Sequence, residues 1–472
     1  MTRPKLLLLL AEVLAFAVLA VIATSHFGTA DGCRITAAYL VAYLVPRIIL
    51  TRARDTSTVA HVVLLAVAVF AGTMDLARLM RWTMLTDYSL QIPNIYGDAR
   101  NYYKCALAMY NGDAVGAQTA FPGFPLMMAG LWKVFGLNAV WPQAMNLMFT
   151  LTTVVLTGMT TRRLLGGQVT VARPTLLAGG MLLTCLLIYC MQMGTSILKE
   201  GSTYISMAMA GFALSSMAAV DEERRKKWRD VLLFVLACAL LALVRTTFLY
   251  FIALGVVVMT LPHWRRDWKM SVGMLAVLLA ALAFGDYLSS YSFDRHAEIV
   301  GGGWNMQRNF VKAGSQAYYH ELIGYYFLLT PWRRLLMLPL TAAVQYVIPL
   351  PFFDPNGLWL NNISKVTYGW YLVGGIALFY YIWLIWRRRA GMGAWAWWAA
   401  LSFLALAYLM AGSVPRYALF IEPLFVPVAM YVLCRLREGQ WRKAFRWYSA
   451  TYVVVLAAAI VLCLFIQNGV MA

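Results

Sequence analysis

Long apolar runs recur along the whole chain and constrain its fold more than any other feature. They include 6–23, 181–193, 276–284 and 453–466. Hydrophobic residues make up 62% of the 472 residues and charged residues only 12%, about half the charged fraction of a soluble domain. Long apolar runs bounded by charges, glycine or proline are typical of membrane-spanning helices. We therefore predict an all-α, polytopic transmembrane bundle, with residues 1–472 forming a single domain.

The net charge of +19 arises from basic clusters between these runs. Most of the 39 lysines and arginines occupy the clusters, at 3–5, 47–54, 162–173, 224–229, 265–269, 387–389 and 435–446. Short basic loops mark the cytoplasmic side of a membrane protein. We expect these clusters to face the cytoplasm and anionic membrane lipid, and we expect no nucleic-acid partner. The predicted location is the cell inner (plasma) membrane, with a cytoplasmic N-terminus.

Placing the basic clusters in the cytoplasm gives about 11–13 spans. The proposed spans are 6–24, 35–50, 59–79, 139–160, 174–193, 203–220, 231–244, 247–261, 270–288, 367–386, 394–411, 418–434 and 448–466. The pair 231–244 and 247–261 is short, so it forms either two crossings or one bent hairpin. The first span is expected to stay uncleaved, because no small-residue cleavage site follows it.

Two long segments lie on the predicted extracytoplasmic side, at 81–138 and 286–366. More than half of the 20 acidic residues fall on this side, so chemistry is expected there. We expect the second segment to form a lid with membrane-parallel helices. The apolar stretch 335–350 fits a helix on the outer leaflet better than a span, because a further crossing would turn the basic cluster 387–389 outward.

The first of these segments carries a specific motif. It reads Gly97-Asp98-Ala99, then Tyr102-Tyr103, Gly112, and Phe121-Pro122-Gly123-Phe124-Pro125 before an apolar run. The motif resembles the first outer loop of the C-type glycosyltransferase fold, in its protein-mannosyltransferase-like branch, whose members use polyprenyl-phosphate sugars. The resemblance covers 90–250 and a short motif within 405–430. The resemblance implies that 81–138 is a catalytic loop, that it holds two helices along the membrane, and that Asp98 is the catalytic base.

The chemistry fits a carboxylate at Asp98, because sugar transfer to a hydroxyl needs a group that takes the acceptor proton. Many family members have a second acidic residue beside this one, whereas this chain has Arg100 two positions on. That departure leaves the metal requirement open, with a divalent cation as one alternative. Another interpretation of Asp98 is a cap for a helix that starts near Ala99.

Three further positions match the family pattern. Glu200 is at the position of a second catalytic acid in the family. Its alternative role is a local salt bridge with Lys199. Arg245 interrupts apolar sequence, where an arginine normally faces a cavity or an anion. The resemblance implies that Arg245 contacts the donor phosphate, and the alternative is a structural pair with a carboxylate such as Glu200.

The third match is Arg416-Tyr417, which resembles an Arg-Tyr motif at the outer end of a late span in the same family. The resemblance implies a second phosphate contact at Arg416 with Tyr417 beside it, and the alternative is an anchor in the headgroup layer. Further candidates for substrate contacts are Arg100, Tyr102, Tyr103, Lys199 and Arg308. Cys33 and Cys105 both fall on the predicted outer side, where a disulfide between them is one alternative.

The predicted activity is an inverting hexosyl- or pentosyltransferase of cell-envelope glycan or glycolipid assembly. It moves a sugar from a polyprenyl-phosphate-linked donor to a hydroxyl of a lipid- or glycan-linked acceptor. One alternative is a polysaccharide polymerase or ligase that uses a lipid-diphosphate oligosaccharide, with Arg308, Arg333 and Arg334 as diphosphate contacts. Another is a carrier or flippase of lipid-linked sugars without chemistry. The sequence has no Gly-Lys-Ser phosphate loop and no Gly-x-Ser-x-Gly motif, which argues against an ATP-driven pump and a lipase-like hydrolase.

Overall fold

In the parts that the computed structural model describes, the chain folds into helices joined by turns and loops. These parts are 3–53, 55–85, 87–95, 97–113, 122–186, 194–218, 227–261, 264–288, 332–333, 335–336, 373–377, 379–381, 383, 392–409, 421–439 and 441–470. No strand occurs in these ranges. The predicted all-α fold is therefore confirmed.

Five helices are long and apolar enough to cross a membrane. They are α1 (Arg3–Phe27), α2 (Thr29–Arg52), α3 (Thr58–Trp82), α6 (Val140–Leu165) and, over Trp268–Gly285, α12 (Trp264–Leu288). Several leucines and valines of α1 are more than 60% exposed, as a surface in contact with lipid would be. The chain has the features of a multi-pass membrane protein.

The other helices coincide with most of the remaining predicted spans and with the first outer segment. They are α4 (Gly97–Asn111), α5 (Gly123–Phe135), α7 (Arg173–Cys185), α9 (Glu200–Ala218), α10 (Lys227–Val244), η2 (Thr246–Phe248), α11 (Leu249–Thr260), α19 (Gly393–Leu409), α20 (Glu422–Arg437) and α21 (Arg442–Val470). The predicted span 367–386 is described only in part, as helix at 373–377, 379–381 and 383. Nearly all of the second outer segment, 286–366, lies outside the described residues, and so does most of its apolar stretch 335–350.

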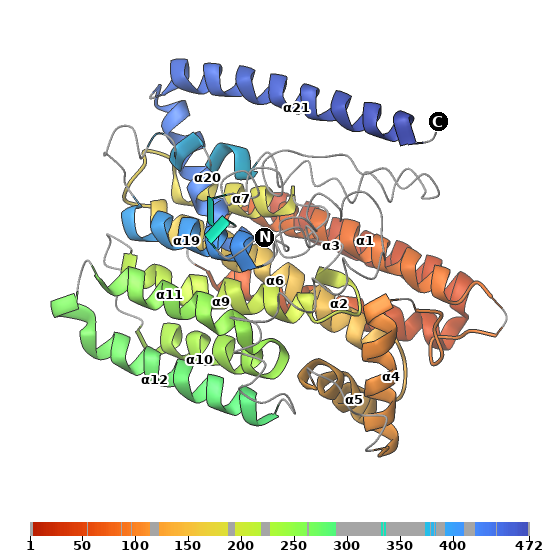
Figure 1. The fold of residues 1–472 in the computed structure, drawn as a ribbon. Helices are drawn as coiled ribbons and strands as arrows, with labels where there is room; N and C mark the ends of the chain where they lie inside the picture. The colour runs from red at the N-terminus through yellow and green to blue at the C-terminus, as the bar shows by residue number, and fades with distance from the viewer. Residues whose placement is uncertain are drawn as a thin grey trace.

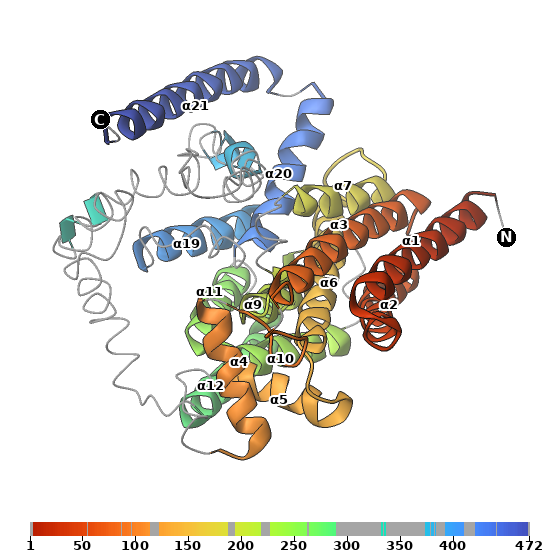
Figure 2. The same ribbon diagram turned by 90° about the vertical axis from the view of Figure 1, so that its right-hand side faces the viewer.

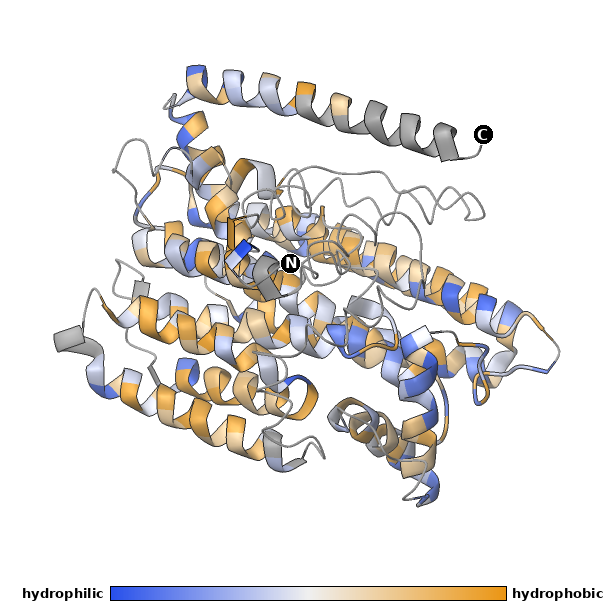
Figure 3. Ribbon diagram, in the orientation of Figure 1, coloured by the Kyte–Doolittle hydropathy of each residue, from blue (hydrophilic) through white to orange (hydrophobic). Residues whose placement is uncertain are grey.

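Two central helices, α6 and α9, organise the bundle (Figures 1 and 2). Helices α2, α3, α7 and α20 pack on α6, while α10 and α11 pack on α9 and α12 packs on α10 and α11. Helices α4 and α5 pack on each other beside the bundle, and α21 runs along its outside (Figures 1 and 2). The bundle helices are largely apolar, whereas α4 carries many hydrophilic residues (Figure 3).

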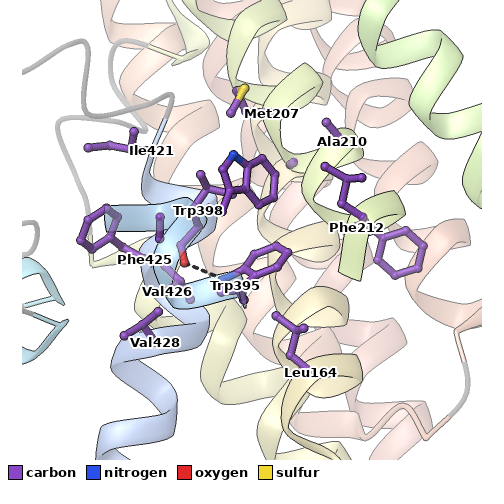
Figure 4. Packing of buried hydrophobic residues seen from close by; sticks show 14 of the residues in the cluster. Leu164, Met207, Ala210, Phe212, Trp395, Trp398, Ile421, Phe425, Val426 and Val428 are labelled. Atoms are coloured by element: carbon purple, nitrogen blue, oxygen red, sulfur yellow. Dashed lines mark hydrogen bonds between the residues drawn. The ribbon is translucent and has the colours of Figure 1, made fainter. Parts of the chain in front are cut away.

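Two tryptophans of α19 fill the space between α9, α11 and α20 (Figure 4). Both are fully buried, and both indole N–H groups donate 2.9 Å hydrogen bonds to backbone carbonyls, Trp395 to Leu424 and Trp398 to Phe251. A Cβ at Gly255 of α11 would lie 2.4 Å from the Trp398 ring. The glycine therefore lets α11 approach α19 closely, and the polar edge of each indole is satisfied inside the core.

One polar group joins the C-terminal ends of α6 and α9 to the start of α10. The Arg163 guanidinium donates to the Phe212 carbonyl at 2.9 Å, lies 3.2 Å from the Asp230 carboxylate and stacks on the Phe212 ring at 3.9 Å. Helices α6 and α9 thus run in the same direction and α10 runs back, as the predicted order of spans requires. This end of the bundle lies next to the basic clusters 162–173 and 224–229.

No disulfide joins the cysteines whose side chains the structure describes, namely Cys33, Cys105, Cys185, Cys238 and Cys434. Cys33 of α2 is exposed and Cys105 of α4 is buried, and neither forms a disulfide. The Cys33–Cys105 alternative was therefore wrong.

Candidate functional site

The first outer segment folds into two helices, as the sequence predicts, and aromatic side chains hold them together. The rings of Tyr102 in α4 and Phe124 in α5 meet edge to face with centroids 5.6 Å apart, and those of Tyr103 and Trp132 are 4.8 Å apart. The Tyr103 hydroxyl donates to the Gln91 carbonyl at 2.8 Å, and burial raises the pKa of Tyr103 above its ordinary value. Tyr103 therefore has a structural role in the centre of this pair.

Asp98 lies in the first turn of α4 with an exposed side chain, and Arg100 is exposed as well. The helix begins at Gly97, earlier than the predicted start near Ala99. Asp98 is thus inside the first turn and not at the cap position, so its carboxylate is stabilised by the positive end of the helix dipole.

The residues before α9, from 194 to 199, form a turn whose backbone is fixed by buried polar side chains. The Asn146 amide of α6 donates to the carbonyls of Ser196 and Leu198, the latter at 2.9 Å. The Thr195 side chain hydrogen-bonds with the Asp75 carboxylate of α3, which also pairs with Arg78 at 2.8 Å. These contacts join α3 and α6 to the turn that leads into Lys199 and Glu200.

The turn ends in a group of buried charges, which we call the Glu200–Arg245 site and define as Lys199, Glu200 and Arg245. These residues are 7%, 2% and 9% exposed, respectively. Arg245 Nη1 lies 3.8 Å from Glu200 Oε1, and the guanidinium stacks on the Phe248 ring at 4.9 Å. The Lys199 ammonium lies 5.6 Å from the centre of the Tyr102 ring of α4. The structure therefore pairs Glu200 with Arg245, which was one of the two alternatives for that arginine.

The backbone explains how an arginine reaches this position. Helix α10 ends at Val244, Arg245 adopts φ −165° and ψ 75°, and the 3-10 turn η2 follows. The interruption predicted at Arg245 is thus a break between two helices. A Cβ at Gly123, the first residue of α5, would lie 1.9 Å from the Leu243 carbonyl oxygen, so α5 meets the end of α10 just before this break.

A second buried carboxylate lies at the same end of α9. The Tyr204 hydroxyl, one turn after Glu200, donates to Glu422 at the start of α20, and both residues are fully buried. We did not predict roles for Asp75, Asn146, Tyr204 or Glu422 from the sequence. The signal for Asp75 was present, because a charged residue inside an apolar run is rare without a partner.

Arg308, Arg416 and Tyr417 lie outside the described residues, so their expected phosphate and substrate contacts remain predictions. Within the described part of the chain, no three His, Cys, Asp or Glu side chains come together as a metal site would require.

Comparisons with protein-family models, with curated proteins and with solved structures find no match for this chain. The functional assignment therefore depends on the residues and their geometry.

Proposed function

We propose that this protein is a membrane glycosyltransferase that moves a sugar from a polyprenyl-phosphate-linked donor to an acceptor hydroxyl. The reaction takes place on the extracytoplasmic face of the inner (plasma) membrane, and the acceptor is lipid- or glycan-linked. The donor tail lies in the bilayer, and its phosphate reaches the Glu200–Arg245 site.

One contact carries the proposal, namely that of Tyr102 with Lys199. Asp98 and Tyr102 are four residues apart in α4 and so lie on the same face of that helix. Since the Tyr102 ring faces Lys199, this contact draws the helix that bears Asp98 towards the Glu200–Arg245 site. A carboxylate suited to proton removal and a guanidinium suited to phosphate thus belong to adjoining elements at one end of the bundle.

In the proposed reaction the acceptor oxygen attacks the anomeric carbon, and the bond from that carbon to the phosphate oxygen breaks. The bonding electrons leave with the polyprenyl phosphate, whose charge Arg245 stabilises, and Arg416 is proposed to add a second contact. The Asp98 carboxylate takes the acceptor proton. Attack opposite the leaving group inverts the anomeric centre.

The test is the Asp98→Asn variant, reconstituted in lipid vesicles that contain acceptor-bearing membrane extract. Radiolabelled polyprenyl-phosphate hexoses and pentoses are supplied, and transfer of label from the donor is measured. We expect a fall of about 10²-fold or more, because a general base contributes that much. Asp87→Asn is the matched control, because Asp87 is an exposed aspartate of the same outer segment.

If the Asp98→Asn variant transferred label from the donor as well as the wild type does, this mechanism would be ruled out. Movement of the intact lipid-linked sugar across the vesicle membrane, without transfer, would favour the carrier instead. Selective use of a lipid-diphosphate oligosaccharide would favour the polymerase or ligase.

A further inference from the structure

We propose that Glu200 is an exchangeable counterion of Arg245, which holds the guanidinium in the empty protein and gives it up to the phosphate of the lipid donor. This inference depends on the proposed function for the identity of the phosphate ligand. It changes the role of Glu200 from a second catalytic acid to a positioning residue. Glu200 does not touch the reacting atoms but controls access to Arg245.

The geometry of the pair differs from that of three other ion pairs whose carboxylate is buried. Arg163 lies 3.2 Å from Asp230, Arg78 lies 2.8 Å from Asp75, and Arg47 lies 2.7 Å from Glu12. At 3.8 Å, the Arg245–Glu200 contact is longer than a hydrogen bond. The two groups therefore attract each other by charge without the directional bond that fixes the other pairs, and this makes the contact easier to exchange.

The comparison with Arg163 is close, because both arginines are buried, stack on a phenylalanine and face a carboxylate of a neighbouring helix. Arg163 also donates to the Phe212 carbonyl at 2.9 Å, which binds it to α9 independently of its carboxylate. The Arg163–Asp230 pair, at the opposite end of the bundle from the proposed site, thus has the geometry of a fixed structural contact. It provides a matched reference for Glu200–Arg245.

Each partner of the pair also has a feature that favours exchange. Glu200 is the first residue of α9, where the positive end of the helix dipole stabilises a carboxylate after its arginine has turned away. Arg245 lies at the break between α10 and η2, where its backbone leaves the helical conformation and its side chain is directed away from the regular helix surface. An incoming phosphate offers the guanidinium two oxygens for a bidentate contact, whereas the Glu200 carboxylate lies beyond hydrogen-bond distance.

The experiment measures binding of farnesyl phosphate, a short polyprenyl monophosphate, to the purified full-length protein in lipid nanodiscs. We expect Glu200→Gln to bind farnesyl phosphate at least tenfold more tightly than the wild type, because the competing anion is gone. The same variant without ligand should melt at a lower temperature, since a buried arginine has lost its carboxylate. Farnesyl phosphate should restore that melting temperature, and farnesol, which lacks the phosphate, should not.

Asp230→Asn is the matched control. It should also lower the melting temperature of the ligand-free protein while its affinity for farnesyl phosphate stays at the wild-type value. Glu200→Asp, which shortens the carboxylate and preserves its charge, is the second variant if Glu200→Gln does not fold, and it should also bind more tightly. A merely structural role for Glu200 would lower the melting temperature in both variants without any gain in affinity.

The outcomes separate this inference from the proposed function. If the wild type binds farnesyl phosphate but the Glu200 variants bind it equally or more weakly, Glu200 is not an exchangeable counterion. The transferase proposal would not be affected by that result. Absence of farnesyl phosphate binding by every protein, including the wild type, would overturn both.

Discussion

Gly123 sets the distance between the outer-segment helices and the bundle. Its missing side chain allows α5 to start against the Leu243 carbonyl, next to the break that contains Arg245. Gly130 lies in the same helix, and a Cβ there would meet nothing within 4 Å. Gly123 is therefore required for a close contact near the proposed site, whereas Gly130 in the same helix is not.

We expect Gly123→Ala to destabilise the protein by about 1–3 kcal/mol, because the new methyl group overlaps a backbone that cannot move far. Gly130→Ala is the control and should be neutral or stabilising by up to about 1 kcal/mol, since alanine favours a helix. Thermal unfolding of both variants in detergent tests this expectation. Equal melting temperatures for the two would contradict the close approach of α5 to α10.

Helix α19 shows how an apolar element acquires a defined place inside a bundle. Trp398 fills the space opposite Gly255, and its indole N–H is bonded to the Phe251 carbonyl. The adjacent Trp397 is 52% exposed and points out of the bundle. Trp398 therefore lies on the inner face of α19, and Trp397 lies on its outer face.

Trp398→Ala should cost about 3–5 kcal/mol, because it leaves a large cavity and removes the hydrogen bond of the indole to the Phe251 carbonyl. Trp397→Ala should change stability little, since its ring contributes little to the core. The yield and melting temperature of the detergent-purified variants measure the difference. If Trp397→Ala were the more damaging of the two, α19 would be oriented differently from this structure.

Most helices could be predicted from the sequence, because apolar runs and basic clusters are local signals. The predicted limits of these helices were less accurate: α7 ends at Cys185 although its apolar run continues to 193, and α4 begins before Ala99.

The partners of the site residues were harder to predict. Glu200 and Arg245 meet because α9 and α10 are antiparallel, and the sequence alone left both Lys199 and Arg245 as alternative partners of Glu200. The link from Asn146 to the 194–199 turn also depends on packing between distant segments.

The whole molecule has buried polar contacts near both ends of its central helices and an apolar core between them. One end holds Arg163 and Asp230, and the other holds the Glu200–Arg245 site and the Asn146 contacts with the 194–199 turn. Because a bilayer has an apolar centre and polar faces, this distribution fits a bundle that spans it. The predicted orientation places the Glu200–Arg245 end outside the cell.

This orientation predicts which engineered cysteines react with a membrane-impermeant maleimide. In a Cys33→Ser background, Met84→Cys should be labelled in intact cells, because Met84 is 74% exposed in the outer segment. Lys443→Cys, exposed at the start of α21, should be labelled only after permeabilisation. The Cys33→Ser parent measures background labelling, and the reverse pattern would place the proposed site in the cytoplasm.

The Glu12–Arg47 contact has a consequence for the biogenesis of the protein. Glu12 lies within α1, the least buried of the five spanning helices, and accepts hydrogen bonds from Tyr43 and Arg47 of α2. Alone in the bilayer, α1 would carry a carboxylate into hydrocarbon, which is costly. Gly28 alone separates the two helices, so α2 is the nearest source of a countercharge during synthesis. We infer that α1 does not settle in the lipid singly but leaves the insertion machinery with α2 as a hairpin.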